Sequence, residues 1–508
     1  MAIKGYLGID AGTQGLSVVF TDENLKVVGT GEATYAMVSA LDEGCYEQLP
    51  SDWDAALSNA MRNLRAQIND ALDVLAIGIS GQMHGEVLAD QNGISLGPAR
   101  LWCDARNEAE ENELTDAMGV KMPKRITSAR WLWTLRNRPE IAQQTHHITT
   151  PAGWLAFQLT GEWVLGIGDA AGMFPIDQTT LDYDQALLEK YDSVAGHTTP
   201  LRKLLPEVRL AGQSGGVLSS QGAAQLGLPK GIPVAPAEGD QPAALAGSLI
   251  GEAGMISCSF GTSVCANSVG DRSFSGVSKA VDHFCAPDGK PINMVWLRNG
   301  TTFMNSVVEM FGLAIGGSRG DGFEKVIPML LDAAPDCGGI IALPFMDDEP
   351  GINVQRGGTA MLLGLNSENA TPGNVVKAAL LSTMFNLRLG CEILDGQGFP
   401  RTELVLSGGL TKTPELAQLL ADVFANPVTL LESAEEGTAW GAALMAKYRN
   451  QVLQGAESPW PDFLSAQATG SSQQYQPETT SVAAYDGVYQ KYKKLLGTQS
   501  MLDEAIHD

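Results

Sequence analysis

One segment of the sequence places a carboxylate where it could act as a general base. Glu238, Gly239 and Asp240 follow an apolar run and precede a helix-like segment of small residues. A carboxylate there lies on a sharp turn, beside the backbone N–H groups that begin the helix. Alternatively, Asp240 is only the N-cap of that helix, with Pro242 in the first turn. Spacing alone favours the cap, because capping aspartates are far more common than catalytic ones.

Three glycine-containing turns follow strand-like runs and could contact phosphate oxygens. The first reads D-A-G-T-Q-G at 10–15, and its N–H groups and threonine hydroxyl converge on one point. Asp10, at the end of the preceding strand, could hold Mg²⁺ through water. Similar turns occur at Gly261-Thr262 and Gly408-Gly409. Taken alone, each turn is better explained as an ordinary structural turn; the first would be a Gly-rich hairpin with a capping aspartate. Three such turns after strands nevertheless favour a nucleotide-contacting role more than one does.

A polar cluster is predicted where two neighbouring strands end, in the motifs G-Q-M-H-G and W-C-D-A-R. His84 in the first motif has no apolar neighbours to shield it, so we do not expect it in a core. Trp102 offers an apolar face on which a sugar ring could stack, and Asp104 with Arg106 offers partners for hydroxyl groups. Alternatively, Asp104 and Arg106 form a local ion pair and Trp102 belongs to the core. The residues alone leave both interpretations open.

The elements that must position these residues follow an α/β pattern. Two β-prone runs, at 6–10 and 16–20, flank the first glycine turn as a hairpin, and a meander continues toward Tyr35. The continuous apolar run at 74–80 predicts a strand buried on both faces. The spacing of apolar residues predicts helices at 53–72, 125–135 and 151–159. Residues 177–230 are expected to form a mostly helical insert.

The second half of the chain starts on the same plan as the first. A strand-like run at 255–260, a Gly-Thr turn and a second run at 264–267 repeat the N-terminal hairpin, and a buried-type strand follows at 404–407. Such a repeat predicts two duplicated domains that face each other across a cleft. We expect domains at 1–249 and 250–508.

The C-terminal region is predicted from composition and spacing. An Ala-rich helix is expected at 440–447. A segment rich in Ser, Gln, Thr and Pro, near 465–481, is expected to be solvated, and a last helix follows at 482–496.

Composition restricts the class of protein. The 508 residues are too many for one core, and 44% hydrophobic with 18% charged residues is ordinary for a soluble globular protein. The net charge of −25 argues against nucleic-acid or anionic-membrane partners, although backbone N–H groups could still bind phosphate. The seven cysteines form no C-x-x-C pair, and no run is long enough to span a membrane. Because the N-terminus also runs directly into strand-like sequence, we expect a cytoplasmic protein.

Taken in order, these motifs resemble the FGGY family of carbohydrate kinases over nearly the whole chain. The Met-His pair at 83–84 is similar to that of xylulokinases, whereas glycerol kinases carry Arg-Glu there. The informative matches are G-I-D-x-G-T at 8–13, G-Q-M-H-G at 81–85, W-x-D-x-R at 102–106, L-T-G-E at 159–162, D-A-A-G at 169–172, G-D at 239–240, F-G-T-S at 260–263, S-G-G at 407–409 and G-T-A-W-G-A-A at 437–443.

The resemblance implies an actin-like (ribonuclease H-like) fold, in which two duplicated α/β domains close over a sugar and ATP. It implies that Asp240 is the general base and that Asp10 and Asp240 hold Mg²⁺. The expected sugar contacts are Met83, His84, Trp102, Asp240 and Gln241. The expected nucleotide contacts are Thr13, Gln14, Gly261, Thr262, Gly300, Gly408, Gly409 and Thr413. The reaction implied is phosphorylation of the terminal hydroxyl of a ketopentose, above all D-xylulose; nucleic acid and membranes are not expected partners, and a homodimer is an option.

Three departures from the family pattern bear on the identity of the sugar. Ala129 and Arg130 stand where Pro and Lys are usual, with Trp133 kept, and Gln241 stands where xylulokinases have Asn. The usual G-E-R-T-P becomes D-D-E-P-G at 347–351. The alternatives are therefore a kinase for another ketose, polyol or sugar acid, such as ribulose, gluconate or a deoxy sugar, or a non-catalytic ATP- and sugar-binding protein.

Overall fold

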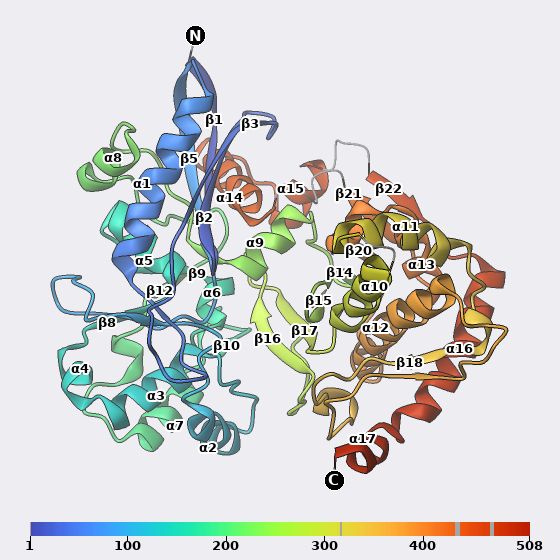
Figure 1. Cartoon of the computed structure of the whole chain (residues 1–508). Coiled ribbons are helices and arrows are strands. Elements are labelled where there is room, and N and C mark those ends of the chain that lie inside the picture. Colours follow the sequence, from blue (N-terminus) through green and yellow to red (C-terminus); the bar gives the residue numbers. More distant parts are fainter. Residues whose placement is uncertain (1, 315–316, 432–436, 468–471, 508) are drawn as a thin grey trace.

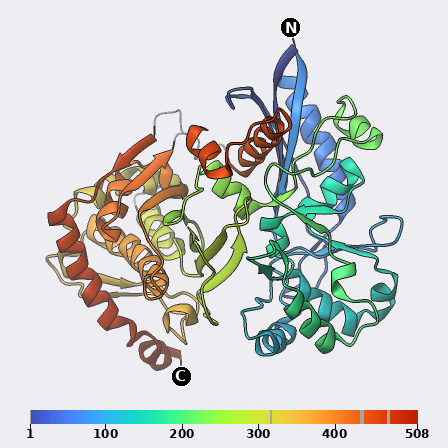
Figure 2. The same ribbon diagram turned by 180° about the vertical axis from the view of Figure 1, so that it is seen from behind.

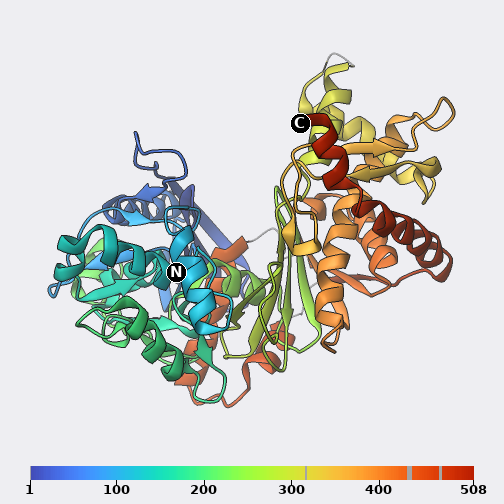
Figure 3. The same cartoon turned by 90° about the horizontal axis from the view of Figure 1, so that it is seen from below.

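Two lobes, each built on its own β-sheet, make up the protein (Figures 1 and 3). The computed structural model describes residues 2–314, 317–431, 437–467 and 472–507. The first sheet has the order β13-β5-β1-β2-β3, with β1 at Ala2–Ala11, β2 at Gly15–Asp22, β3 at Val27–Thr34, β5 at Ala71–Gly81 and β13 at Glu238–Gly239. The second has the order β16-β17-β15-β14-β20-β21-β22, with β14 at Met255–Phe260, β15 at Val264–Val269, β16 at Val281–Cys285, β17 at Pro291–Leu297, β20 at Glu403–Gly408, β21 at Val428–Leu431 and β22 at Ser472–Tyr475.

The two sheets share one topology, as the internal repeat predicted. In the first lobe β1 pairs antiparallel with β2 and parallel with β5. In the second lobe β14 pairs antiparallel with β15 and parallel with β20. The central strand of each sheet is therefore the first strand of its half, and it runs directly into a glycine turn.

Helices and short strands cover the two sheets (Figure 1). The helices of the first lobe are α1 (Pro50–Gln67), α2 (Glu108–Met118), α3 (Thr127–Asn137), α4 (Pro139–Gln144), α5 (Pro151–Thr160), α6 (Ile167–Ala171), α7 (Gln185–Ala195), α8 (Ser220–Leu226) and α9 (Asp240–Gly247). Those that follow are α10 (Thr302–Ala314), α11 (Arg319–Asp332), α12 (Pro372–Asp395), α13 (Glu415–Phe424), α14 (Gly437–Leu453), α15 (Trp460–Gln467), α16 (Thr479–Leu496) and α17 (Gln499–His507). The short strands are β4 (Glu47–Gln48), β6 (Val87–Ala89), β7 (Ala99–Arg100), β8 (His147–Thr149), β9 (Val164–Gly166), β10 (Ile176–Asp177), β11 (Asp182–Tyr183), β12 (Glu207–Arg209), β18 (Ile341–Leu343) and β19 (Met361–Leu363).

Three expectations from the sequence are wrong in part. The helix expected at 53–72 ends at Gln67, because residues from Ala71 onward pair with β1 as part of β5. The insert at 177–230 is mostly irregular, since prolines and glycines interrupt it and only α7, α8 and one 3₁₀ turn are helical. The polar segment near 465–481 is exposed as expected where the structure describes it, but it contains the edge strand β22, which pairs with β21; residues 468–471 lie outside the described residues.

Helix α14 joins the two lobes. Although it belongs to the second half of the sequence, it packs against β1, β5 and α9 of the first lobe (Figures 1 and 2). The backbones approach so closely that a Cβ at Gly8 would lie 1.8 Å from the carbonyl oxygen of Ala439, and one at Gly78 equally close to that of Ala442. Trp440 also donates from Nε1 to the carbonyl of Leu25 at 3.0 Å.

The predictions for the C-terminal helices and for membrane spans can be compared with the structure. The motif at 437–443 lies in α14, which begins at Gly437, whereas residues 432–436 lie outside the described part of the chain. The last predicted helix is confirmed as α16, and α17 follows it. Within the described ranges, every helix is too short or too polar to cross a membrane.

Substituting Gly78 tests the close contact between β5 and α14. We expect Gly78→Ala to lower the free energy of unfolding by more than about 2 kcal/mol, because its methyl group would overlap the α14 backbone. Gly487→Ala is the matched control: Gly487 lies in α16 with open space around its Cβ position, so Ala should raise stability by about 0.5–1 kcal/mol. Urea denaturation measures both changes. Equal stability of the two variants would contradict the packing described for α14.

Candidate active site

Asp240 is the first residue of α9, and it is not the helix cap. The N-cap is Gly239, and no side chain caps this helix end. The Asp240 carboxylate instead accepts hydrogen bonds from the backbone N–H of Gln241, at 2.8 Å, and from that of Met83. Burial, together with the nearby Asp10 carboxylate, raises the pKa of Asp240 to about 7. The cap interpretation is therefore wrong, and the carboxylate remains available for chemistry.

Sheet register brings Asp10 and Asp240 together. Strands β1, β5 and β13 are parallel, so their carboxyl ends meet at one edge of the first sheet. In this register Asp10 lies beside Ser80, and Ser80 lies beside Glu238. The Ser80 hydroxyl donates to Asp10 Oδ1 at 2.7 Å, and burial raises the pKa of Asp10 as well. Two carboxylates that lie far apart in sequence thus share one edge.

A cavity of about 290 Å³ opens at this edge, and both lobes line it. It contains all five residues predicted to contact the sugar, namely Met83, His84, Trp102, Asp240 and Gln241. Seven further residues line it, of which only Gly261 was predicted, as a nucleotide contact: Arg125, Ser259, Gly261, Ser263, Cys265, Met294 and Trp296. Arg125 lies over the Trp296 ring at 5.7 Å, so a cation from the first lobe meets an aromatic side chain from the second. No local pattern in the sequence marks Arg125 or Trp296.

His84 is held in one orientation at the cavity wall. Its backbone has a φ of 64°, in the left-handed region that non-glycine residues seldom adopt. Its Nδ1 lies 2.9 Å from the carbonyl oxygen of Gly172. Burial and the nearby Arg125 lower the pKa of His84 to about 3, so the ring is neutral. Because a carbonyl only accepts, Nδ1 must carry the proton, which leaves Nε2 as a hydrogen-bond acceptor.

The motif at 102–106 divides its residues between cavity and scaffold. Trp102 is 42% exposed, so it is not a core residue, and its Nε1 donates to Thr13 Oγ1 at 3.1 Å. Asp104 is completely buried and forms an ion pair with Arg106 at 2.6 Å. The local ion pair predicted as one alternative is therefore confirmed, and Asp104 faces Arg106 and the backbone of Tyr46.

The first glycine turn is anchored to the cavity wall by side-chain hydrogen bonds. The Thr13 hydroxyl donates to Gln82 Oε1 at 3.2 Å. The backbone carbonyl of Thr13 accepts from Gln48 Nε2 at 2.7 Å. The Tyr35 hydroxyl reaches the carbonyl oxygens of Gly12 and Gly15. Gln14, at the tip, is exposed.

The turns of the second lobe are arranged in the same way. Gly408, at the end of β20, lies beside Phe260 in the sheet register, so Gly409 and the Gly261 turn meet at one edge. The N–H of Gly300 donates to the carbonyl of Thr262 at 3.0 Å, which joins Gly300 to that turn. A larger residue does not fit in place of Gly300, since its Cβ would lie 2.3 Å from the carbonyl oxygen of Gly261. Thr413 follows the 3₁₀ turn Gly409–Lys412.

The unusual segment at 347–351 supports the Gly300 region and does not line the cavity. The Glu349 carboxylate is buried and accepts from Asn299, from the backbone N–H at 2.9 Å and from Nδ2 at 3.0 Å. Asn299 in turn bonds the backbone of Asp347 in both directions at 3.0 Å. This departure from the family pattern therefore acts on the turn next to Gly300.

Asp10 and Asp240 fit a hydrated Mg²⁺, which binds through one or two carboxylates and completes its shell with water and phosphate oxygens. Among the residues that the structure describes, no three His, Cys, Asp or Glu side chains converge as a metal cage. The carboxylate pair thus suits a cation that arrives with a phosphate ligand better than one held by protein alone.

Residues 5–247 match the N-terminal domain of the FGGY family of carbohydrate kinases, and residues 256–449 match its C-terminal domain. The chain belongs to this family. It is a carbohydrate kinase, and the predicted two-domain α/β fold with an interdomain cleft is confirmed.

This FGGY kinase is similar to proteins named for different sugars. A xylulose kinase of Haemophilus influenzae is 27% identical over 464 residues, which cover 88% of this chain and 90% of that protein. The crystal structure of a xyloylose kinase from Brucella ovis has a TM-score of 0.81 at 24% identity, covering 98% of this chain and all of that one. That of a gluconate kinase from Lactobacillus acidophilus has a TM-score of 0.80 at 19% identity, with coverage of 99% and 100%. The fold alone does not decide the sugar.

Two more buried acids lie behind the cavity of this FGGY kinase. Glu238 accepts from the backbone N–H of Asp169 at 2.8 Å, and Thr150 donates to Asp169 Oδ2 at 2.5 Å. Burial, and secondarily the Asp240 carboxylate, raises the pKa of Asp169 to about 8. Burial and Asp169 likewise hold the pKa of Glu238 well above its usual range. The fold therefore favours the protonated form of both acids more than water does.

The raised pKa of Asp169 predicts a pH dependence of stability. Between about pH 4 and pH 8 the folded protein keeps a proton on Asp169 that the unfolded chain releases, so stability falls as the pH rises. Asp169→Asn cannot ionise and still accepts from Thr150. We therefore expect the melting temperature to fall less between pH 5 and pH 8 in this variant than in the wild type. The exposed Asp73→Asn is the control, and an equal fall in all three proteins would contradict the assignment.

Proposed function

We propose that this kinase transfers the γ-phosphoryl group of ATP to the terminal hydroxyl of a ketopentose, and that its substrate is D-xylulose, giving D-xylulose 5-phosphate. The observation that carries the proposal is the position of Asp240 in a cavity that also contains Met83, His84 and Gln241. The names of the relatives support the choice of sugar.

Asp240 would act as the general base, accepting the proton of the terminal hydroxyl as its oxygen attacks the γ-phosphorus. A base works best when its pKa lies near the working pH, and Asp240 meets that condition. The helix start at Asp240 adds N–H dipoles, which favour negative charge on the incoming phosphoryl group. Mg²⁺, held by Asp10 and Asp240, would neutralise charge on the phosphate oxygens.

Two polar side chains would orient the sugar. The Nε2 atom of His84 is free to accept from a sugar hydroxyl. Gln241 Oε1 accepts from Asn267 Nδ2 at 3.1 Å, so the Gln241 amide has its N–H groups left to donate to the sugar. Asn267 belongs to the second lobe, which makes the orientation of Gln241 dependent on how the lobes meet. The indole face of Trp102 would cover the apolar side of the sugar.

We assign the sugar and the base to residues 1–249, and the nucleotide to residues 250–508. Gly261, Thr262, Gly300, Gly408, Gly409 and Thr413 would contact ATP from the second lobe, with Thr13 and Gln14 facing its phosphates. The shared register of β14 and β20 supports this assignment, because it gathers the glycine turns at one edge. Closure of the lobes over both substrates would exclude water and limit futile hydrolysis of ATP.

A panel of sugars, assayed by coupled ADP release, tests the proposed substrate. We expect D-xylulose to give the highest kcat/KM, ahead of ribulose, glycerol, gluconate and deoxy sugars. The Gln241→Asn variant is the matched comparison, since Asn would draw the amide back by one methylene and should lower kcat/KM for the preferred sugar. A different sugar at the top of the panel would contradict the assignment to xylulose. Binding of ATP with no turnover of any sugar would contradict kinase activity itself.

A further inference from the structure

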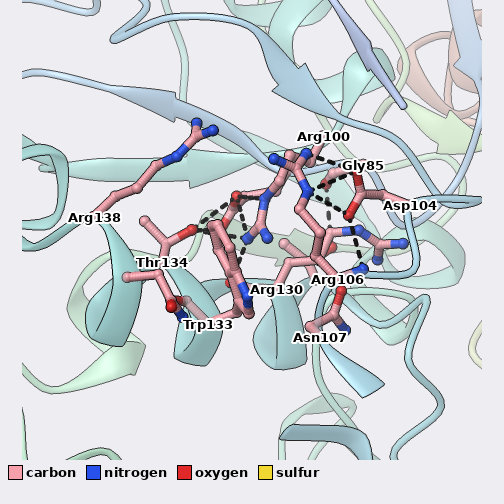
Figure 4. A network of polar contacts seen from close by, with 12 residues as sticks. Gly85, Arg100, Asp104, Arg106, Asn107, Arg130, Trp133, Thr134 and Arg138 are labelled. Atoms are coloured by element: carbon pink, nitrogen blue, oxygen red, sulfur yellow. Dashed lines mark hydrogen bonds and ion pairs between the residues drawn. The ribbon is translucent and has the colours of Figure 1, made fainter. Parts of the chain in front are cut away.

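Arg130 lies in α3 beneath the cavity and is completely buried. Its guanidinium donates to four backbone carbonyl groups: Nε to Leu101 at 3.0 Å, Nη2 to Trp102 at 2.7 Å, and Nη1 to His84 at 3.0 Å and to Arg125 at close range. Figure 4 shows it within a wider network of polar contacts. Arg130 does not line the cavity itself.

Three of these carbonyls belong to residues whose side chains line the cavity. His84, Trp102 and Arg125 come from three segments that are separate in sequence, and Arg130 bonds the backbone of all three. The bond to the His84 carbonyl stabilises an unfavourable backbone conformation. His84 has a left-handed backbone, which costs a non-glycine residue about 1 kcal/mol or more. One side chain thus bonds the backbone of three of the six first-lobe residues that line the cavity.

We propose that Arg130 is the positioning residue of the sugar cavity, holding His84, Trp102 and Arg125 in the one arrangement that accepts the substrate. The inference rests on the proposed sugar-binding role of that cavity. Guanidinium chemistry explains why the residue is arginine: five N–H donors lie in one plane and point in fixed, divergent directions. Lysine, the usual residue of the family at this position, presents three donors from one atom, so in this chain it would bond fewer of these four carbonyls.

Neighbouring charged and aromatic side chains form a connected network that reaches Arg130 through Arg100. Arg100 bonds the Arg130 carbonyl through Nη2 and pairs with Glu86 at 2.8 Å. The Trp133 ring lies under the guanidinium groups of Arg100, at 4.5 Å, and of Arg106, at 5.3 Å. Arg106 is itself paired with Asp104. In the W-x-D-x-R motif, the carbonyl of Trp102 therefore accepts from Arg130, whereas Asp104 and Arg106 form an ion pair that supports this part of the fold.

The variant Arg130→Lys tests this inference, with Arg388→Lys as the matched control. Arg388 also donates to a carbonyl, that of Val423 at 2.9 Å, and to Asp486 at 2.8 Å, but it lies in α12 of the second lobe. We expect Arg130→Lys to raise the KM for the sugar at least about tenfold, because misplaced contacts weaken binding, while the Kd for ATP stays within about twofold. Arg388→Lys should leave the KM for the sugar unchanged even where it lowers the melting temperature.

Hydrogen–deuterium exchange supplies a readout that does not depend on turnover. Arg130→Lys should exchange faster around His84, Trp102 and Arg125 together, and Arg388→Lys should not. If the wild type phosphorylates no sugar, the proposed function fails, and the exchange pattern still decides whether Arg130 positions these segments. The inference is overturned if folded Arg130→Lys keeps a sugar KM within about twofold of the wild type, or if the three segments exchange as in the wild type.

Discussion

Parallel pairing of β1, β5 and β13 positions the acidic residues of the candidate active site. It brings the ends of three strands to one edge, where Asp10, Ser80 and Glu238 lie side by side, and it delivers Asp240 as the first residue of α9. The edge is closed from behind by α14, which can approach only because β1 and β5 carry glycine at the contact. The first sheet therefore both positions the acidic residues and packs against the helix that comes from the second half of the chain.

The acidic side chains gathered at this edge are costly to ionise, and this cost has a functional consequence. Asp169 and Glu238 are buried close to the half-buried Asp240, and each carboxyl has a raised pKa, mainly because desolvation disfavours the charged form. Asp240 differs from the other two because it lines the cavity, where a cation and a phosphoryl group can approach it. The same burial that makes the acids unfavourable as anions therefore makes Asp240 basic enough to accept a proton.

Much of the fold could be predicted from the sequence, because strands and glycine turns are local signals and both halves carry them. Spacing alone favours a cap at Asp240, since an aspartate at a helix start is ordinarily a cap, whereas the structure has Gly239 as the N-cap and Asp240 as the first helical residue. Arg125, Trp296 and Arg130 could not be predicted as a set, because they meet through contacts between segments far apart in sequence. The strand β22 was missed for the same reason: its polar residues are ordered by pairing with β21.

A single kinetic comparison decides whether Asp240 is the general base. Sugar-dependent ADP release by Asp240→Ala is compared with the wild type, with ATP binding measured on the same protein by nucleotide titration. Loss of a positioned base lowers turnover by about 10² to 10⁴. The variant is expected to lose nearly all sugar-dependent ADP release while it still binds ATP. Turnover like that of the wild type would remove Asp240 from the base role.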